Sequence, residues 1–285
     1  MKEIAYYDGQ IGSPDEVMIP FNDRVHFFGD GVYEATLGGN GRAFLLQDHL
    51  DRFYSSAKAL KINIPMEKQE LGELVEKLLG QVEGTTQFVY WQITRGVATR
   101  EHTYDPDLMG KLWIYIKPFT MKDPEKAIGV ITEEDTRYYH CNIKTLNLLP
   151  SVVAAQHAKE AGVGETVLHR GEIVTECAHS NVSILKNGIF ISHPNDNMIL
   201  RGISKTHMIQ ACYRLGITVL ERPFTLEELM EADEILVTSA SNFYRYVVSV
   251  DGKPAGGKDP ETRKLLQKAV IDEFLAYTGK KSLFE

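Results

Sequence analysis

The sequence predicts an α/β (α+β) protein with two domains. Segments that alternate apolar and polar residues, as strands do, are interspersed with segments in which apolar residues recur at helical spacing. The 285 residues suffice for one large core or two smaller ones, and a polar, proline-containing stretch at 118–124 interrupts the pattern. We therefore expect a small N-terminal α/β domain at 1–117, a linker at 118–124 and a larger domain at 125–285.

In the N-terminal part, Asp8-Gly9 favours a hairpin turn between two short strands. Gly29 and Gly31 allow a close approach of the backbone, and in the strand that follows them Tyr33 and Glu34 face opposite ways. Arg52 lies off the apolar stripe of its helix, so it is either a solvated residue or an anion contact. The expected strands are 4–7, 10–11, 32–36, 88–94 and 111–117, and the expected helices are 46–60 and 68–79.

In the C-terminal part, a predicted helix follows Gly202-Ile203-Ser204, and the free N–H groups of such a helix start can hold an anion. The hydroxyl-rich turn Thr238–Ser241 could supply further donors. Glu176 stands just past a strand end, where a carboxylate either closes a turn or keeps a pyridine nitrogen protonated. The expected strands are 128–132, 166–169, 173–174, 182–186, 189–192 and 234–238, and the expected helices are 150–161, one ending near 215, 226–230 and 261–277.

Composition and charge limit the partners of the protein. The formal net charge of −8 and the pI of about 5.6 argue against duplex nucleic acid and anionic membranes, which both require a basic surface. The three cysteines are widely separated and form no CxxC pair, which suits a reducing cytosol. The N-terminus lacks the apolar core of a signal peptide and the chain lacks a run of ~18 apolar residues, so we expect a cytoplasmic protein.

The segment Cys141–Pro150 contains the candidate catalytic residue. Lys144 lies among apolar and amide residues, and the nearest acidic residues in sequence are Asp135 and Glu160. Partial burial would disfavour the ammonium form and free a neutral amine, which is the form that bonds to an aldehyde cofactor. A lysine at a strand end that extends to water is the alternative for this segment taken alone.

Seven ordered motifs resemble those of one family over Ile4 to about Leu265. They are Phe28-Gly29-Asp30-Gly31-Val32-Tyr33-Glu34, His49-Leu50-Asp51-Arg52, Thr94-Arg95-Gly96 with Arg100 and His102, Ile143-Lys144 with Leu146-Asn147-Leu148-Leu149, Thr175-Glu176, Ser180-Asn181, and Asn197-Met198-Ile199-Leu200 with Gly202-Ile203. The sequence is similar to the fold-type IV pyridoxal-phosphate aminotransferases, and within them to the D-amino-acid aminotransferases. Seven matches in order are more specific than any one of them.

The resemblance implies a two-domain fold with a C-terminal, cofactor-binding pseudo-barrel, and a homodimer. It implies transfer of an amino group between a D-amino acid, such as D-alanine, and 2-oxoglutarate, which gives a 2-oxo acid and D-glutamate. Lys144 would bond to the aldehyde of pyridoxal 5′-phosphate. The other cofactor contacts implied are Arg52, Arg137, Glu176, Leu200, Ile203, Ser204, Ser239 and Ala240. Tyr33, with Arg100 and His102 from the second subunit, would bind the substrate α-carboxylate. We expect no metal, membrane or nucleic-acid partner.

The chain departs from the family pattern at several positions. Ala240 stands where a threonine usually contacts the phosphate, so that contact would come from the backbone or from Ser239 or Ser241. Phe243 and Tyr244 replace an acidic and an aliphatic residue, and His179 lies where the family has serines. The alternatives are a branched-chain L-amino-acid aminotransferase or an aminodeoxychorismate lyase of the same fold, and a non-catalytic cofactor-binding protein.

Overall fold

The computed structural model describes residues 2–284, which group by their contacts into two compact units. The first unit comprises the chain up to Met121, the segment Ile143–Asn147 and the chain from Phe274 onward. The second unit comprises Lys122–Asn142 and Leu148–Glu273. The predicted bounds 1–117, 118–124 and 125–285 remain a prediction, and the segment that contains Lys144 belongs to the first unit.

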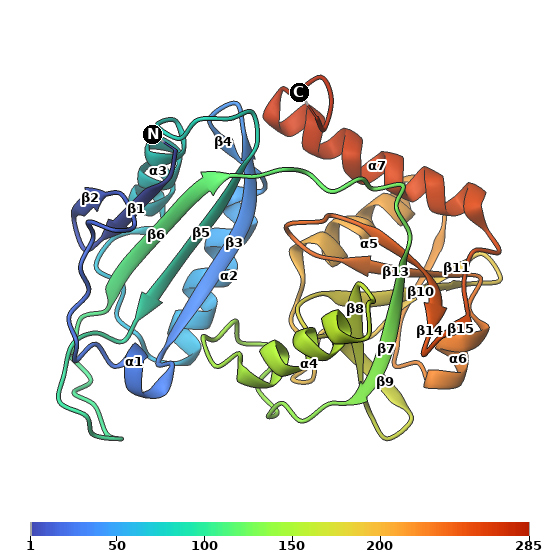
Figure 1. Cartoon of the computed structure of the whole chain (residues 1–285), viewed down its shortest axis with the longest axis horizontal. Helices are drawn as coiled ribbons and strands as arrows, with labels where there is room; N and C mark the ends of the chain where they lie inside the picture. Colours follow the sequence, from blue (N-terminus) through green and yellow to red (C-terminus); the bar gives the residue numbers. More distant parts are fainter. Residues whose placement is uncertain (1, 285) are drawn as a thin grey trace. The chain divides into compact units, whose positions relative to one another are not determined.

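The first unit is built on a six-stranded antiparallel sheet with the strand order β2-β1-β6-β5-β3-β4 (Figure 1). Its strands are β1 (Ile4–Tyr7), β2 (Gln10–Gly12), β3 (Gly31–Gly39), β4 (Arg42–Ala43), β5 (Gln87–Thr94) and β6 (Lys111–Pro118). Its helices are α1 (Val25–Phe28), α2 (Leu46–Ala59) and α3 (Lys68–Leu79). Gly31, the first residue of β3, allows the predicted close approach, because a Cβ on it would lie 2.5 Å from the Ile93 carbonyl oxygen.

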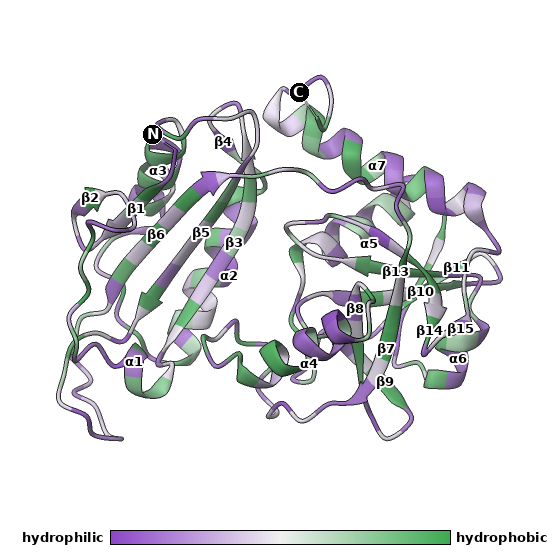
Figure 2. Cartoon of the chain, in the orientation of Figure 1, coloured by the Kyte–Doolittle hydropathy of each residue, from purple (hydrophilic) through white to green (hydrophobic). Residues whose placement is uncertain are grey.

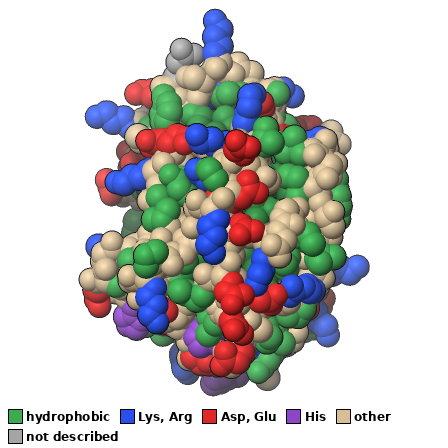
Figure 3. Space-filling model, turned by 90° about the vertical axis from the view of Figure 1, so that its right-hand side faces the viewer, with side chains coloured by type: hydrophobic (Ala, Val, Ile, Leu, Met, Phe, Trp, Pro, Cys, Tyr) green, Lys and Arg blue, Asp and Glu red, His purple; other side chains and the backbone are tan. Residues whose placement is uncertain are grey.

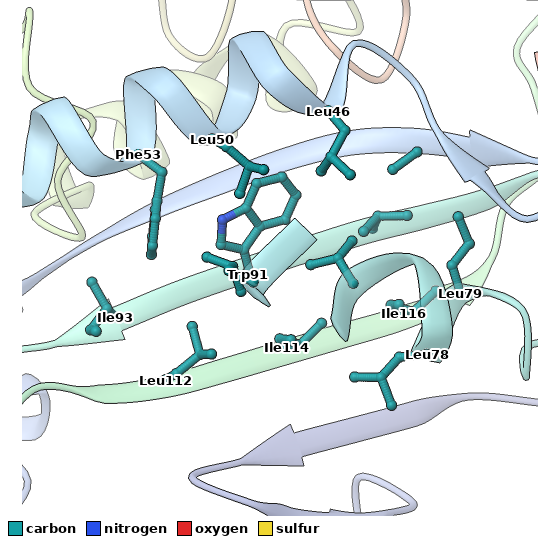
Figure 4. Close-up of a cluster of buried hydrophobic side chains, with 14 of the residues drawn as sticks. Leu46, Leu50, Phe53, Leu78, Leu79, Trp91, Ile93, Leu112, Ile114 and Ile116 are labelled. Atoms are coloured by element: carbon teal, nitrogen blue, oxygen red, sulfur yellow. The ribbon is translucent and has the colours of Figure 1, made fainter. Parts of the chain in front are cut away.

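The core of the first unit lies between this sheet and the helices α2 and α3. Trp91 of β5 is fully buried against apolar side chains of α2, including Leu50 and Phe53 (Figure 4). Buried and more exposed residues alternate along β6, and the same alternation is visible in its hydropathy (Figure 2). The apolar residues at every second position of the strands and those at helical spacing in α2 and α3 therefore pack into one core.

The second unit contains a nine-stranded mixed sheet (Figure 1). Eight of its strands follow the order β12-β11-β10-β13-β14-β7-β8-β9, and the ninth, β15, pairs with β14. Parallel pairing joins β7 to β8 and to β14, and β11 to β12. The strands are β7 (Ile128–Glu134), β8 (Glu165–Arg170), β9 (Ile173–Cys177), β10 (Asn181–Lys186), β11 (Ile189–Ser192), β12 (Thr218–Glu221), β13 (Glu234–Thr238), β14 (Arg245–Val250) and β15 (Lys253–Pro254). The helices that begin in this unit are α4 (Leu149–Glu160), α5 (Ile203–Arg214), α6 (Leu226–Glu231) and α7 (Pro260–Thr278).

The structure confirms the mixed α/β class and most of the predicted elements. The bounds of α3, β11 and β13 are those that the sequence predicts. One placement was wrong: Glu176 lies inside β9 and not past its end, because the antiparallel pairing of Val167 with Cys177 extends the strand. Acidic and basic side chains are interspersed on the face shown in Figure 3, as on a solvated surface. Within residues 2–284, no helix has both the length and the hydropathy to cross a lipid bilayer.

Candidate active site

Lys144 lies in a short segment that is hydrogen-bonded to β3 and α2 of the first unit. The Tyr33 N–H donates to the Lys144 carbonyl at 3.0 Å, and Val32 forms an isolated bridge with Thr145. The Lys144 N–H donates to Ser56 Oγ at 3.3 Å. The side chain is half-buried, and its Nζ lies 4.2 Å from the centre of the Tyr33 ring. Hydrogen bonds therefore fix the backbone at Lys144 and Thr145, and the Lys144 amine faces an aromatic ring.

Arg52 does not extend freely into solvent but binds the buried carboxylate of Glu34. Arg52 Nε lies 2.6 Å from Glu34 Oε1, and Arg52 Nη2 lies 2.8 Å from Glu34 Oε2. His49 Nδ1 lies 2.6 Å from the same Oε2. Burial would raise the pKa of Glu34, but Arg52 and His49 outweigh it and lower the pKa to about 2. Glu34 is therefore ionised and orients the Arg52 guanidinium.

Glu176 of the second unit lies in a dense set of hydrogen bonds. Arg137 Nη1 lies 2.5 Å from Glu176 Oε1, and Asn181 Nδ2 and the Leu200 N–H donate to Oε2 at 2.8 and 3.0 Å. Asp135 in turn holds the Arg137 guanidinium at 2.9 Å. Burial raises the pKa of Glu176, and Arg137 and the Leu200 N–H act in the opposite direction. Two predicted cofactor contacts, Arg137 and Leu200, thus each bind the carboxylate of a third, Glu176.

The start of α5 is an uncapped helix N-terminus held close to the same cluster. Gly202 is the N-cap residue, and a glycine has no side chain that could accept a hydrogen bond from the first turn. The N–H groups of Ile203 and Ser204 have no partner within the helix, as at any helix start. Asn181 also donates to the Leu200 carbonyl at 3.0 Å, and a Cβ on Gly202 would lie 1.8 Å from Asn181 Oδ1. The helix start and Glu176 are therefore fixed together by one asparagine.

The predicted hydroxyl-rich turn follows β13 directly. The buried side-chain oxygens of Thr238 and Asn242 have no hydrogen-bond partner within residues 2–284. Ser239 and Ala240 lie between them and are half-buried. Buried polar atoms usually have a partner in folded proteins, so these two oxygens can accept hydrogen bonds from a ligand or from water.

Arg100 and His102 lie on the exposed loop between β5 and β6. Both contact Phe28, the last residue of α1: the Arg100 guanidinium lies 5.4 Å and the His102 ring 5.3 Å from the centre of the Phe28 ring. Tyr33, the third predicted carboxylate contact, stacks on Tyr90 at 5.6 Å. The loop therefore presents an arginine and a histidine against one aromatic ring.

His49, which binds the same Glu34 carboxylate as Arg52, and Asn181, which binds Glu176, were not among the predicted site residues. His49 precedes Arg52 by three residues, which places both on one face of α2, and that spacing was a usable signal. Asn181 belongs to a recognised motif, but its contact with Glu176 depends on the turn between β9 and β10. Within residues 2–284, no group of three or more His, Cys, Asp or Glu residues is arranged to hold a metal ion.

Comparison with known proteins identifies the family. The family model described as amino-transferase class IV matches residues 31–250. The chain belongs to the class IV aminotransferases. It is 40% identical over 273 residues to the D-alanine aminotransferase of Listeria monocytogenes serotype 4b, which covers 93% of this chain and 94% of that protein. The D-alanine aminotransferase of Staphylococcus aureus (strain MSSA476) is 35% identical over 270 residues, with 92% and 95% covered.

The fold also matches solved structures. The branched-chain amino acid aminotransferase from Escherichia coli superposes with a TM-score of 0.87 at 20% sequence identity, covering 98% of this chain and 96% of that one. Another branched-chain amino acid aminotransferase, solved with pyridoxamine 5′-phosphate, superposes with a TM-score of 0.88 at 21% identity, covering 99% and 96%. The predicted fold of this family and the predicted enzyme class, a pyridoxal-phosphate-dependent aminotransferase, are confirmed.

Proposed function

We propose that this class IV aminotransferase transfers the amino group of D-amino acids such as D-alanine to 2-oxoglutarate, giving a 2-oxo acid and D-glutamate. The observation that carries the D-specific part is the pair Arg100 and His102, which share one exposed loop and one aromatic neighbour, Phe28. The similarity to D-alanine aminotransferases over more than nine-tenths of the chain supports the same reading.

The residues fit pyridoxal 5′-phosphate as the cofactor. Arg52, oriented by Glu34, and the uncapped N–H groups of Ile203 and Ser204 are suited to a phosphate. The turn at Ser239 and Ala240, which is flanked by unpaired buried oxygens, adds backbone and hydroxyl donors. Leu200 would pack on the ring.

Glu176 and Arg137 would set the charge of the cofactor ring. When bound, the cofactor supplies an aldehyde that bonds to amines and a ring that accepts electron density from the substrate Cα. Glu176 would keep the pyridine nitrogen protonated, because an anionic carboxylate next to that nitrogen favours its charged form. Arg137 holds the Glu176 carboxylate and would lie near the phenolic oxygen of the cofactor.

Lys144 would bond to the cofactor aldehyde in the resting enzyme. Once free, its Nζ would act as the base that takes the proton from the substrate Cα and passes it to the electron sink that the cofactor would supply. The second half-reaction runs in reverse from the 2-oxo acid. The Lys144 backbone is hydrogen-bonded to Tyr33 and Ser56, and these contacts would hold the Lys144 amine in place during both half-reactions.

The carboxylate contacts select the hand of the substrate. Arginine binds a carboxylate through two parallel hydrogen bonds, and tyrosine and histidine add donors that fix its orientation. With the carboxylate held by Tyr33, Arg100 and His102, the Cα–H bond of only one enantiomer points at Lys144. Arg100 and His102 are proposed to act on the site of a partner subunit, so the active form is a homodimer.

A panel of amino donors with 2-oxoglutarate tests the proposal. We expect D-alanine to be deaminated, D-glutamate to form, and L-leucine to be inert. A response to L-leucine alone would instead indicate a branched-chain L-amino-acid aminotransferase. Borohydride reduction of the holoenzyme, followed by peptide mapping, should label Lys144. The variant Lys144→Ala should lose activity, whereas Lys58→Ala on the exposed face of α2 should retain it.

A further inference from the structure

The loop that presents Arg100 and His102 is held by one buried guanidinium. Arg24 is 3% exposed, and its Nη1 donates to the carbonyls of Glu101 at 2.7 Å and Thr103 at 3.2 Å. Its Nη2 lies 3.5 Å from the His102 carbonyl. Three consecutive carbonyls of the loop thus face the same side chain. Within one subunit all side chains at 99–107 are exposed, so contacts to the backbone, and not side-chain burial, restrain the loop there.

Asp30 anchors this guanidinium to the rest of the first unit. Arg24 Nε donates to Asp30 Oδ2 at 2.8 Å, and Arg95 Nε donates to the same oxygen at 2.9 Å. The Arg95 guanidinium donates to the carbonyl of Leu60 at 3.0 Å and lies 3.7 Å from the centre of the Tyr104 ring. Two arginines on one carboxylate therefore connect the loop to its supporting elements.

Phe28 contacts both Arg24 and the proposed carboxylate-binding residues Arg100 and His102. The Arg24 guanidinium lies 4.9 Å from the centre of the Phe28 ring, whose other neighbours include Arg100 at 5.4 Å and the His102 ring at 5.3 Å. Cations interact favourably with an aromatic ring at such distances. The ring therefore restrains the orientation of both side chains, while Arg24 restrains the backbone that carries them.

We propose that Arg24 and Phe28 are positioning residues for substrate carboxylate binding by Arg100 and His102. This inference rests on the proposed function. An exposed loop without such restraints would have to be ordered by the substrate, and the apparent dissociation constant rises as the fraction of binding-competent loop falls. Arg24 and Phe28 keep the loop in the binding-competent conformation before the substrate arrives.

The variant Arg24→Met tests the backbone restraint in the holoenzyme. We expect the KM for D-alanine to rise about tenfold with kcat changed less than about twofold, because saturating substrate restores loop order. Amide hydrogen exchange in the peptide 97–107 should accelerate, and the absorbance of the bound cofactor should not change. Arg24→Lys, which keeps a charge for Asp30 but loses the planar fork, should give an intermediate KM. The matched control is Arg42→Met, because Arg42 donates to the Tyr277 carbonyl, away from the loop.

Two further variants keep the test decisive. Phe28→Leu leaves every Arg24 hydrogen bond in place and should raise the same KM, so it decides the proposal if Arg24→Met fails to fold. A primary amine without a carboxylate should react with Arg24→Met and Phe28→Leu as fast as with wild type, because it does not use the carboxylate site. If these two variants lose reactivity towards this amine as much as towards D-alanine, the proposal is wrong. If Arg100→Met raises the KM for D-alanine while Arg24→Met and Phe28→Leu do not, the positioning role is wrong. If Arg100→Met itself has no effect, the proposed carboxylate site is wrong.

Discussion

Glu34 and Arg52 form a buried two-point ion pair, with Arg52 Nε and Nη2 at 2.6 and 2.8 Å from the two carboxylate oxygens. Glu34 is fully buried and Arg52 is 12% exposed. The pair connects β3, which carries Tyr33, to α2, whose Ser56 accepts a hydrogen bond from Lys144. The predicted phosphate contact is therefore also part of the structure that supports Lys144, the proposed catalytic residue.

Replacing Glu34 by glutamine should destabilise the protein by about 3 kcal/mol, because the Arg52 guanidinium loses the buried anion that compensates its charge and His49 loses a charged hydrogen-bond partner. Urea denaturation of the apoenzyme measures the change. Glu73→Gln on the exposed face of α3 is the matched control and should change the free energy of unfolding by less than about 0.5 kcal/mol. Equal effects of both substitutions would show that the ion pair contributes nothing beyond an ordinary surface charge.

The contribution of Glu34 should depend on pH in a defined direction. Its pKa is about 2 in the folded protein against an ordinary value of 4.5, so its stabilisation is fully present above pH 4.5 and is lost as the pH falls towards 2. The difference in unfolding free energy between wild type and Glu34→Gln should therefore shrink between pH 5 and pH 3. A difference that stays constant over this range would contradict the assigned pKa.

Local patterns were sufficient to predict α2 to α7, though not the short helix α1, and to indicate the chemistry of the site. The apolar repeat of α3 gave its bounds, and the positions of Lys144 and Glu176 in recognised motifs gave their proposed roles. The short strands β12 and β14 escaped prediction because exposed or polar residues interrupt their alternation. Their pairing partners in the sheet, and not their own residues, make them strands.

Contacts made by backbone atoms correspond to no recognisable sequence pattern. The segment that contains Lys144 joins the first unit through its hydrogen bonds with Tyr33 and Gly31, which no local pattern indicates. Arg24 likewise binds carbonyl oxygens of residues some eighty positions away, and every residue type supplies a carbonyl. The support of the site could therefore be found only in the folded chain.

Glu176→Gln should lower kcat by about 100-fold while the cofactor remains bound. A neutral amide cannot stabilise a protonated pyridine nitrogen, so the ring becomes a weaker electron acceptor, whereas the phosphate contacts are unaffected. Steady-state kinetics and the absorbance of the purified enzyme measure the two effects. Glu172→Gln, in the exposed turn before β9, is the control. Unchanged kcat in Glu176→Gln would remove Glu176 from the proposed mechanism.

Gly202→Ala should weaken cofactor binding by about tenfold or more, which corresponds to at least ~1.4 kcal/mol. The new Cβ would lie 1.8 Å from Asn181 Oδ1, so either the asparagine or the start of α5 must move. Asn181 holds Glu176 at 2.8 Å and the Leu200 carbonyl at 3.0 Å, and its displacement would therefore disturb both the carboxylate and the helix N–H groups proposed to bind the phosphate.

Equilibrium titration of the apoenzyme with pyridoxal 5′-phosphate measures the affinity. Gly80→Ala at the end of α3, where the nearest atom would be 3.6 Å away, should bind the cofactor as wild type does. Equal affinity in both variants would show that the Asn181 contacts do not control the cofactor site.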